Sequence, residues 1–340
     1  MKLAMLHGPR DLRIEDHESP DPSKLEPDQV LVKTEISALK IGTDRGNYEG
    51  AEDVPGAPVY PRQVGDSNLG VVSAVGSQVT RFQVGDRVVS RMWHQSEYVA
   101  AESEWSMVRV PAGVDSADAV YSHLYALSAF CYSKAQFIPG EYVAVVGVGV
   151  LGLGAIAVGP LIGARVVGIA NSPQRMEMAR TMGVHECFLS DDPDLHEKLD
   201  DFTGGAGIDL VILTANPWPA YRTAMQIARE NGRVSIVGLS GRGEADLDFN
   251  PLAMDLFYAK SLSIIAVNGT AGDLYPPVDG GHRFPAERQC SYILSLMEDG
   301  RLKPSKLITH CMKYTDMVEA YEMIYRREKG MMGVLFEWDN

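Results

Sequence analysis

The stretch GVGVLG contains three glycines whose spacing is typical of a turn that binds a dinucleotide. Gly147, Gly149 and Gly152 follow the apolar run YVAVV, which predicts a strand, and precede a segment that predicts a helix. The first glycine allows the sharp turn, the second lets backbone N–H groups approach a pyrophosphate, and the third lets the helix pack on the strand. The N–H groups and dipole of that helix then hold the phosphates. The contacts expected here are Gly147, Gly149, Val150, Leu151 and Gly152.

This turn lies in an uncharged stretch, residues 143 to 164, that allows two other interpretations. The stretch exceeds the ~18 apolar residues of a membrane-span candidate. A membrane helix is disfavoured because β-favouring residues and a glycine turn open the stretch, and Pro160 and Gly163 interrupt its far end. The second alternative is a buried strand, turn and helix whose glycines only allow tight packing.

The next strand candidate, read as VVGIANSPQR, bears on the type of dinucleotide. NAD specificity usually needs an acidic residue at the end of this strand, where it binds the ribose 2′-OH. Ala170 stands there, while Asn171, Ser172 and Arg175 could donate hydrogen bonds or charge to a 2′-phosphate. The sequence therefore predicts NADP. The alternative is that Asn171 and Ser172 form a turn and cap the helix after Pro173, with Arg175 on its solvated face.

Two kinds of element surround these residues. Up to about residue 115, short alternating segments predict a curved all-β unit, with strands at 29–36, 69–75, 87–90 and 106–110. From about residue 116, strands and helices alternate, which is typical of parallel βαβ units. The strands expected there are 142–146, 165–170, 210–214, 233–239 and 261–267, with helices at 173–182 and 220–230.

The last seventy residues begin with a loop rich in Gly and Pro, TAGDLYPPVDGGHRFP, which we expect either to cover a substrate or to be a mobile surface connection. A helix (286–299), a strand (306–309), a second helix (316–326) and a final strand (333–338) should follow.

Composition limits the partners. The 340 residues allow about two domains of ~150 residues. A formal charge of −14 argues against nucleic acid or an anionic membrane as partner. The four cysteines include no CxxC pair, so neither a disulfide framework nor a structural zinc site is expected. No signal-peptide core is apparent after MKLAMLHGPRD, and the expected location is cytoplasmic.

The order of parts resembles the medium-chain dehydrogenase/reductase superfamily, the relatives of alcohol dehydrogenase. The matching pieces are IGTDRGNYEG, VGDSNLGVVSAVGSQVTRFQVGDRV, PGEYVAVVGVGVLG, GARVVGIANSPQRMEMARTMG, NGRVSIVG and GVLFEW. The resemblance implies an α/β fold with a GroES-like, β-rich catalytic domain (1–120 and 270–340) and a Rossmann doubly wound parallel sheet domain (121–269). It also implies a small-molecule substrate and a homodimer formed through sheet edges.

Zinc-dependent members of this superfamily carry ligands in CGTD and GHE motifs, and this sequence departs from both. Ile41 stands at the Cys position, and Asp66 and Ser67 stand at the His and Glu positions. One carboxylate cannot hold a zinc ion that takes three or four protein ligands. The four-cysteine lobe that binds structural zinc is also missing. No metal is therefore expected. The altered motifs IGTD and GDS resemble those of a zinc-lacking branch of the superfamily that includes bacteriochlorophyllide hydroxyethyl dehydrogenases.

Without a metal, other groups must stabilise charge on a substrate oxygen and move a proton. Thr43 matches the hydroxyl residue of the family motif, so the resemblance implies a proton relay. Asp66 occupies a former ligand position, Lys40 is a possible acid if burial lowers its pKa, and His94 and His123 are possible acids or bases. The alternatives are hydrogen-bonded histidines, a surface lysine, and an Asp66 that caps a turn.

By resemblance, the carboxyl ends of later strands complete the cofactor site. The residues implied are Thr214, Ala215, Val237, Gly238, Leu239, Val267, Asn268 and Gly269.

Three functions remain open. The first is a zinc-independent, NADP-dependent enzyme that interconverts a secondary alcohol and a ketone or aldehyde, which the GTD motif favours. The second is an NADPH-dependent enoyl or quinone reductase. The third is a nucleotide-binding protein without catalytic activity.

Overall fold

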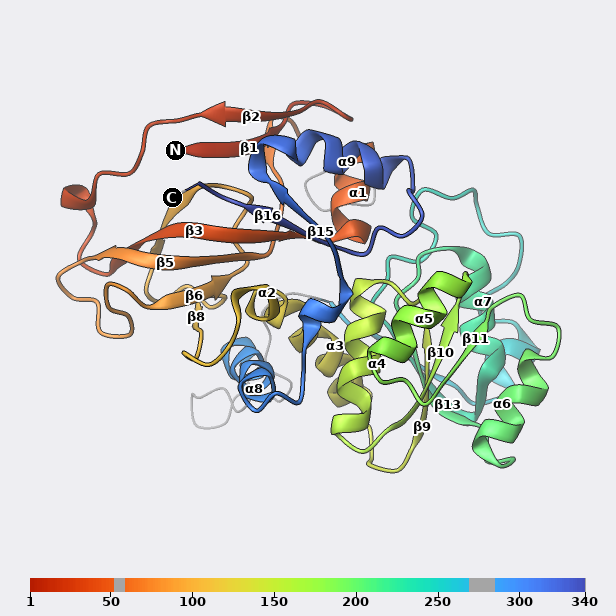
Figure 1. Cartoon of the computed structure of the whole chain (residues 1–340). Helices are drawn as coiled ribbons and strands as arrows, with labels where there is room; N and C mark the ends of the chain where they lie inside the picture. Colours follow the sequence, from red (N-terminus) through yellow and green to blue (C-terminus); the bar gives the residue numbers. More distant parts are fainter. Residues whose placement is uncertain (52–58, 269–284, 340) are drawn as a thin grey trace. The chain divides into compact units, whose positions relative to one another are not determined.

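A computed structural model describes residues 1–51, 59–268 and 285–339 of the chain (Figure 1). The chain forms two compact units: unit 1 comprises Met1–His123 and Ala271–Asn340, and unit 2 comprises Leu124–Thr270. The family resemblance assigns catalysis to residues 1–120 and 270–340 and dinucleotide binding to residues 121–269. These two roles stay predictions. Within the described residues, no helix has both the length and the apolar content needed to span a bilayer.

Unit 2 is built on a six-stranded parallel sheet. Its strands, in spatial order, are β11 (Glu186–Leu189), β10 (Arg165–Ala170), β9 (Tyr142–Val146), β12 (Ile208–Leu213), β13 (Ala228–Ile236) and β14 (Ser263–Ala266). This is the 3-2-1-4-5-6 order of a doubly wound sheet, whose direction of winding reverses between β9 and β12. The runs VAVV in β9 and LVIL in β12 are fully buried, as expected for strands covered on both faces.

Helices join these strands. They are α4 (Val150–Leu161), α5 (Pro173–Thr181), α6 (Leu195–Thr203) and α7 (Trp218–Ile227), and a π-helical turn at Met254–Tyr258 precedes β14. A further helix, α3 (Ser122–Lys134), precedes β9. Alternate residues of β9, Ala144 and Val146, share one core with side chains of α6 and α7. The predicted helix 220–230 is wrong at its end, because Ala228 pairs with Ile208 of β12 and the chain from there belongs to β13.

Unit 1 contains two sheets. The larger has the strand order β15 (Ile308–Lys313), β16 (Gly333–Glu337), β3 (Gln29–Leu39), β5 (Asn68–Val75), β6 (Arg87–Ser90) and β8 (Val108–Arg109), and β7 (Glu97–Ala101) also pairs with β3. The smaller has the order β2 (Leu12–Asp16), β1 (Lys2–Leu6) and β4 (Arg62–Gln63). Figure 1 shows β16, in blue, beside β3, in red, and Val334 pairs with Leu39, so both ends of the chain build this unit.

The helices of unit 1 are α1 (Ile41–Glu49), α2 (Ser116–Ala119), α8 (Ala286–Glu298) and α9 (Met317–Tyr325). Short 3₁₀ turns occur at Pro22–Lys24, Pro304–Leu307 and Tyr314–Asp316. Tyr48 of α1 and Tyr321 of α9 pack edge to face in a core with Leu39 and Phe336. The loop rich in Gly and Pro after Val267 lies almost entirely outside the described residues, so its expected role is not addressed by the structure.

Candidate functional site

The glycine turn of unit 2 joins β9 to α4, at the position that the sequence predicts. Gly147 has a φ of 99°, a conformation that L side chains rarely adopt. A Cβ on Gly147 would lie 2.7 Å from the backbone nitrogen of Ala215, and a Cβ on Gly152 would collide with the carbonyl oxygen of Gly147. These two positions therefore admit only glycine without rearrangement of the turn.

Gly149 differs from the other two glycines because the space beside it is open. A Cβ there would meet one atom within 4 Å, Nη1 of Arg175 at 3.7 Å. Gly149 is also the N-cap of α4, and no side chain caps this helix end. The first N–H groups of α4 are thus available to an anion, as the phosphates of a dinucleotide require. The residues present fit such a cofactor.

The ends of neighbouring strands surround this turn. Thr214 donates a hydrogen bond to the carbonyl oxygen of Gly147 (2.6 Å), and a Cβ on Gly238 would lie 2.9 Å from the carbonyl oxygen of Thr214. The N–H of Val267 bonds the last residue of β13. The cofactor positions at these strand ends, Ala215, Val237, Leu239 and the exposed Asn268 among them, stay predictions, and Gly269 lies outside the described residues.

The side chains after β10 bear on whether the dinucleotide carries a 2′-phosphate, as NADP does. Ala170 ends the strand and is buried. Ser172 accepts the N–H of Arg175 as the N-cap of α5, so Ser172 does cap the helix, while Asn171 is exposed. Arg175 does not simply point into solvent, because its Nη1 donates to the carbonyl oxygen of Val148 at 2.7 Å. This contact holds the guanidinium against the glycine turn.

Unit 1 contains a cluster of three charged side chains, Lys40, Asp66 and Arg91. Lys40 Nζ lies 2.9 Å from Oδ2 of Asp66 and donates to the Asp66 carbonyl oxygen at 2.8 Å. Arg91 donates from Nε to Oδ1 (2.6 Å) and from Nη2 to Oδ2 (2.7 Å). The side chains are 11%, 21% and 29% exposed, respectively. We call these residues the charged cluster.

Strand pairing brings the charged cluster together. Lys40 directly follows β3, Asp66 comes two residues before β5, and Arg91 directly follows β6. Ser37 of β3 pairs with Asn68 of β5, which in turn pairs with Ser90 of β6. In antiparallel neighbours the end of one strand meets the start of the next, so the three residues lie at the same edge.

The cluster fixes the charge of Asp66. Burial alone would raise the pKa of this carboxyl, but the charges and hydrogen bonds of Lys40 and Arg91 lower it to about 2. Burial lowers the pKa of Lys40, and Asp66 opposes this shift. With both cations charged, the cluster carries one excess positive charge in a protein whose formal net charge is −14. It can stabilise negative charge on an oxygen.

Asp44 follows Lys40 by four residues and is buried. Its carboxylate accepts the backbone N–H of Lys40 at 2.7 Å and so fixes the start of α1. Burial raises the pKa of Asp44 to about 6. Thr43, one residue earlier, is exposed, and its hydroxyl has no hydrogen-bond partner among the described residues.

The two candidate histidines are buried in unit 1, close enough to the charged cluster for its charges to act on both rings. His94 Nδ1 lies 2.8 Å from Ser37 Oγ, and the ring packs edge to face on Phe336. His123 Nε2 lies 3.9 Å from Sγ of Cys290. Burial lowers the pKa of His94 to about 3 and that of His123 to about 4. Both rings are therefore neutral near pH 7.

The sequence did not identify Arg91 or Asp44, and it left open whether Asp66 caps a turn. Asp66 caps no helical turn, because the strand β5 begins two residues later, at Asn68. No motif in the sequence marks Arg91 as a site residue. The available signal was its position, directly after the predicted strand 87–90 and three residues before the candidate His94. Asp44 is the last residue of the IGTD motif and could have been identified from it.

The residues at the former metal positions do not fit a zinc ion. Ile41 offers no ligand atom, and Ser67 donates its hydroxyl to the carbonyl oxygen of Val120. Both carboxylate oxygens of Asp66 bond cations, whose charge repels a metal ion. Over residues 1–51, 59–268 and 285–339, no three His, Cys, Asp or Glu side chains could share a metal ion.

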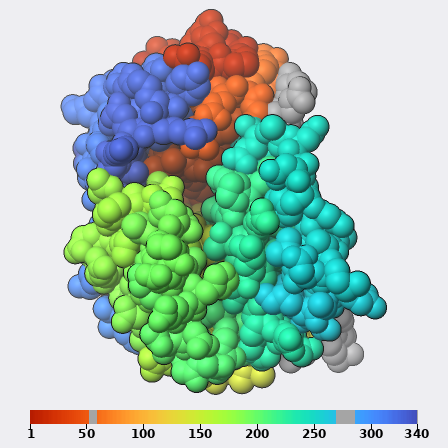
Figure 2. Space-filling view, turned by 90° about the vertical axis from the view of Figure 1, so that its right-hand side faces the viewer, coloured from red at the N-terminus to blue at the C-terminus, as the bar shows by residue number. Residues whose placement is uncertain are grey.

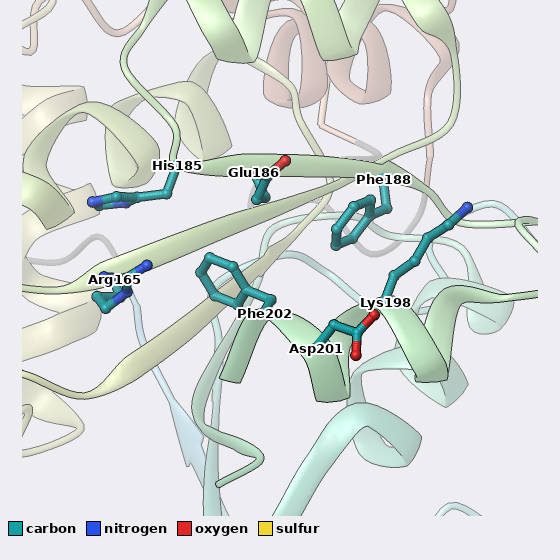
Figure 3. Close-up of a pocket in the computed structure, with 7 residues that line it drawn as sticks. All are labelled: Arg165, His185, Glu186, Phe188, Lys198, Asp201 and Phe202. Carbon is teal, nitrogen blue, oxygen red and sulfur yellow. The ribbon is translucent and has the colours of Figure 1, made fainter. Parts of the chain in front are cut away.

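A separate pocket of about 550 Å³ lies at the edge of unit 2 (Figure 3). Its lining includes Arg165 and Glu186, the first residues of β10 and β11, together with Lys198 and Phe202 of α6. Figure 3 shows the Phe202 ring between α6 and the strands. Arg165 and Glu186 begin their strands, so they lie at the amino end of the parallel sheet, whereas the glycine turn follows the carboxyl end of β9. This pocket is therefore separate from the candidate dinucleotide site.

Two family models match the chain: the alcohol dehydrogenase GroES-like domain over residues 26–136 and the zinc-binding dehydrogenase over residues 150–277. Sorbitol dehydrogenase from Halalkalibacterium halodurans is 25% identical over an alignment of 350 positions that covers 94% of each chain. NADP-dependent isopropanol dehydrogenase from Thermoanaerobacter brockii is 24% identical over 77% of this chain and 80% of its own.

Among solved structures, galactitol-1-phosphate dehydrogenase from Escherichia coli matches with a TM-score of 0.82 and 19% identity, over 99% of this chain and 100% of the other. At this identity the likeness concerns the fold. With the family models, it confirms the predicted fold class, a GroES-like unit together with a Rossmann unit.

Proposed function

Since the chain belongs to the medium-chain dehydrogenase/reductase superfamily, we propose that it is a zinc-independent, NADP(H)-dependent oxidoreductase that interconverts a secondary alcohol and a ketone or aldehyde. The relatives named sorbitol and isopropanol dehydrogenase support the alcohol chemistry. The charged cluster carries the zinc-independent part of the proposal, because two cations hold the carboxylate at a former metal position.

A bound nicotinamide supplies the hydride. The residues of this chain bind the cofactor and handle the charge on the substrate oxygen. The glycine turn and the start of α4 hold the pyrophosphate through backbone N–H groups. Lys40 and Arg91 provide positive charge for the oxygen, which is the work of a Lewis-acid metal in zinc enzymes.

Two observations support NADP over NAD. Ala170 places no carboxylate at the end of β10, so this residue does not repel a 2′-phosphate. Arg175, bonded to the carbonyl oxygen of Val148, is a cation next to the glycine turn. The relative from Thermoanaerobacter brockii, named as NADP-dependent, is consistent with this choice.

The proposed enzyme is a homodimer in the cytoplasm. Strand β14 ends the sheet of unit 2 and is partly exposed, so it can pair with the same strand of a second copy. Exposed Leu252, Met254 and Tyr258 precede it, in the segment that Figure 2 colours cyan. The four cysteines are free, which fits a reducing compartment. Sedimentation of the purified chain tests the dimer.

Three measurements test the main proposal. Purified protein should contain no stoichiometric zinc, and chelator treatment should leave its activity unchanged. NADPH should bind more tightly than NADH. In a panel of ketones, enones and quinones with NADPH, we expect oxidation of the cofactor with ketones. Turnover of enones or quinones alone would indicate an enoyl or quinone reductase, and binding without turnover would indicate a nucleotide-binding protein.

A further inference from the structure

Lys40 combines a partly accessible position with a hydrogen that the protein does not use. The side chain is 11% exposed. Two ammonium hydrogens have acceptors, both on Asp66: the carboxylate oxygen Oδ2 at 2.9 Å and the backbone oxygen at 2.8 Å. Among the described residues this ammonium has no third acceptor. One N–H therefore remains for a ligand.

The other candidate groups of unit 1 are less suited to exchange a proton with a substrate. His94 and His123 are buried, and burial keeps both rings neutral. The Asp66 carboxylate stays charged and is bonded by two cations. Thr43 is exposed but has no partner among the described residues that could take its proton. Elimination leaves Lys40.

We infer that Lys40 is the proton donor to the substrate oxygen during carbonyl reduction, and that Asp66 and Arg91 are positioning residues that hold its side chain. The inference rests on the proposed function and names the catalytic residue for it. In the reverse reaction, the neutral amine of Lys40 removes the hydroxyl proton of the alcohol.

The step is balanced in atoms and charge. The carbonyl carbon accepts a hydride from the reduced nicotinamide, and the electron pair of the C=O π bond moves to the oxygen. An N–H bond of the Lys40 ammonium breaks as the O–H bond of the alcohol forms. The neutral amine then regains a proton from water, which the exposed part of the side chain allows.

The surroundings of Lys40 favour this exchange. Burial lowers the pKa of Lys40, and Arg91 shifts it in the same direction, while Asp66 and Asp44 oppose the shift. His94 and His123 also interact with Lys40 but are neutral near pH 7. An ammonium in this position releases its proton more readily than an exposed lysine does. Asp66 meanwhile holds the Lys40 ammonium through its carboxylate and its backbone oxygen.

Substitutions of Lys40 test the role, using a ketone that the unchanged protein reduces with NADPH. We expect Lys40→Met to lower kcat by roughly 10²–10⁴-fold, the usual range for a lost general acid, with the Kd for NADPH within about threefold. Lys40→Arg keeps the charge and the Asp66 pair but hardly releases a proton, so kcat should also stay low. Lys198→Met, which removes a lysine of α6 that pairs with Asp192, is the control and should keep its activity.

Chemical rescue separates proton donation from a structural role. In Lys40→Ala, added primary amines of equal size should restore turnover, and the restored rate should depend on the pKa of the amine. A purely structural cation would give rescue that is independent of amine pKa. Thermal unfolding of each variant reports on folding, and Lys40→Arg decides if Lys40→Met does not fold.

The outcomes distinguish the two proposals. Wild-type turnover with full activity in Lys40→Met or Lys40→Arg would overturn the role of Lys40 and leave the proposed function intact. Absence of wild-type turnover on every ketone and alcohol would overturn the proposed function, and the role of Lys40 with it. Low activity in both variants, together with pKa-dependent rescue, supports the inference.

Discussion

Lys40 and Asp66 form an ion pair of 2.9 Å at the edge where β3 and β5 meet, with most of both side chains buried. Arg91 bonds the same carboxylate, so two cations share one anion. This arrangement occupies a position that the family resemblance assigns to zinc ligands.

Removing the charge of Asp66 should destabilise unit 1. Asp66→Asn leaves two partly buried cations without their anion, and we expect the free energy of unfolding at pH 7 to fall by about 2 kcal/mol. The pKa of Asp66 is lowered to about 2, so its stabilisation is present above the ordinary value of 3.8 and is lost as the pH falls through 2. Urea unfolding at pH 7 and pH 3 measures this difference. Asp16→Asn, in an exposed pair with Lys2, is the control and should change stability little.

Two alanine substitutions in the glycine turn should separate folding from binding. Gly152→Ala places a Cβ against the carbonyl oxygen of Gly147, so both the thermal midpoint and dinucleotide binding should fall. Gly149→Ala meets only Arg175 Nη1 at 3.7 Å and should keep the thermal midpoint within about 2 °C. Its methyl group nevertheless stands where the pyrophosphate approaches, so the Kd for NADPH should rise by about tenfold or more. Unchanged binding in Gly149→Ala would contradict this assignment.

Arg175 should select between the two dinucleotides. We expect Arg175→Ala to raise the Kd for NADPH by roughly 10–100-fold, the loss of one charge-assisted contact, and the Kd for NADH by much less. Arg180→Ala, on the same helix but paired with Glu177, is the matched control. Fluorescence titration with both cofactors measures the effect. An equal loss for NADH and NADPH would mean that Arg175 supports the glycine turn through Val148 and does not bind a 2′-phosphate.

Asp44 should make stability depend on pH between about 4 and 6. Burial raises its pKa from 3.8 to about 6, so its contribution is most favourable below pH 3.8 and is lost as the pH rises through 6. The shift corresponds to a cost on the order of 3 kcal/mol above pH 6. Asn can still accept the N–H of Lys40, and Asp44→Asn should therefore become more stable relative to wild type on going from pH 3.5 to 7.5. A difference in unfolding free energy that does not vary with pH would refute the shift.

The sequence predicted the features that depend on residues close together in the chain. The strand, turn and helix around Gly147 and Gly152 lie within twenty residues, and each glycine has a steric reason that is visible in the spacing. The cap at Ser172, which the sequence offered as an alternative to a 2′-phosphate contact, is equally local, since Ser172 bonds the N–H of a residue three positions later. The substitutions at Ile41 and Asp66 needed only the family motif. The helix predicted at 220–230 went wrong at Ala228, where pairing with a distant strand outweighed helical periodicity.

What the sequence determined by itself is the alternation of strands and helices in unit 2, the place of the glycine turn, and the residues that stand at the motif positions of zinc ligands. Only the tertiary structure decided which candidate side chains meet. Arg91 is 25 residues from Asp66 and 51 from Lys40, and the register of β3, β5 and β6 brings them together. It also buries both histidines and turns Arg175 back onto the glycine turn. Burial and long-range pairing depend on how distant segments pack, and a short sequence pattern does not specify that packing.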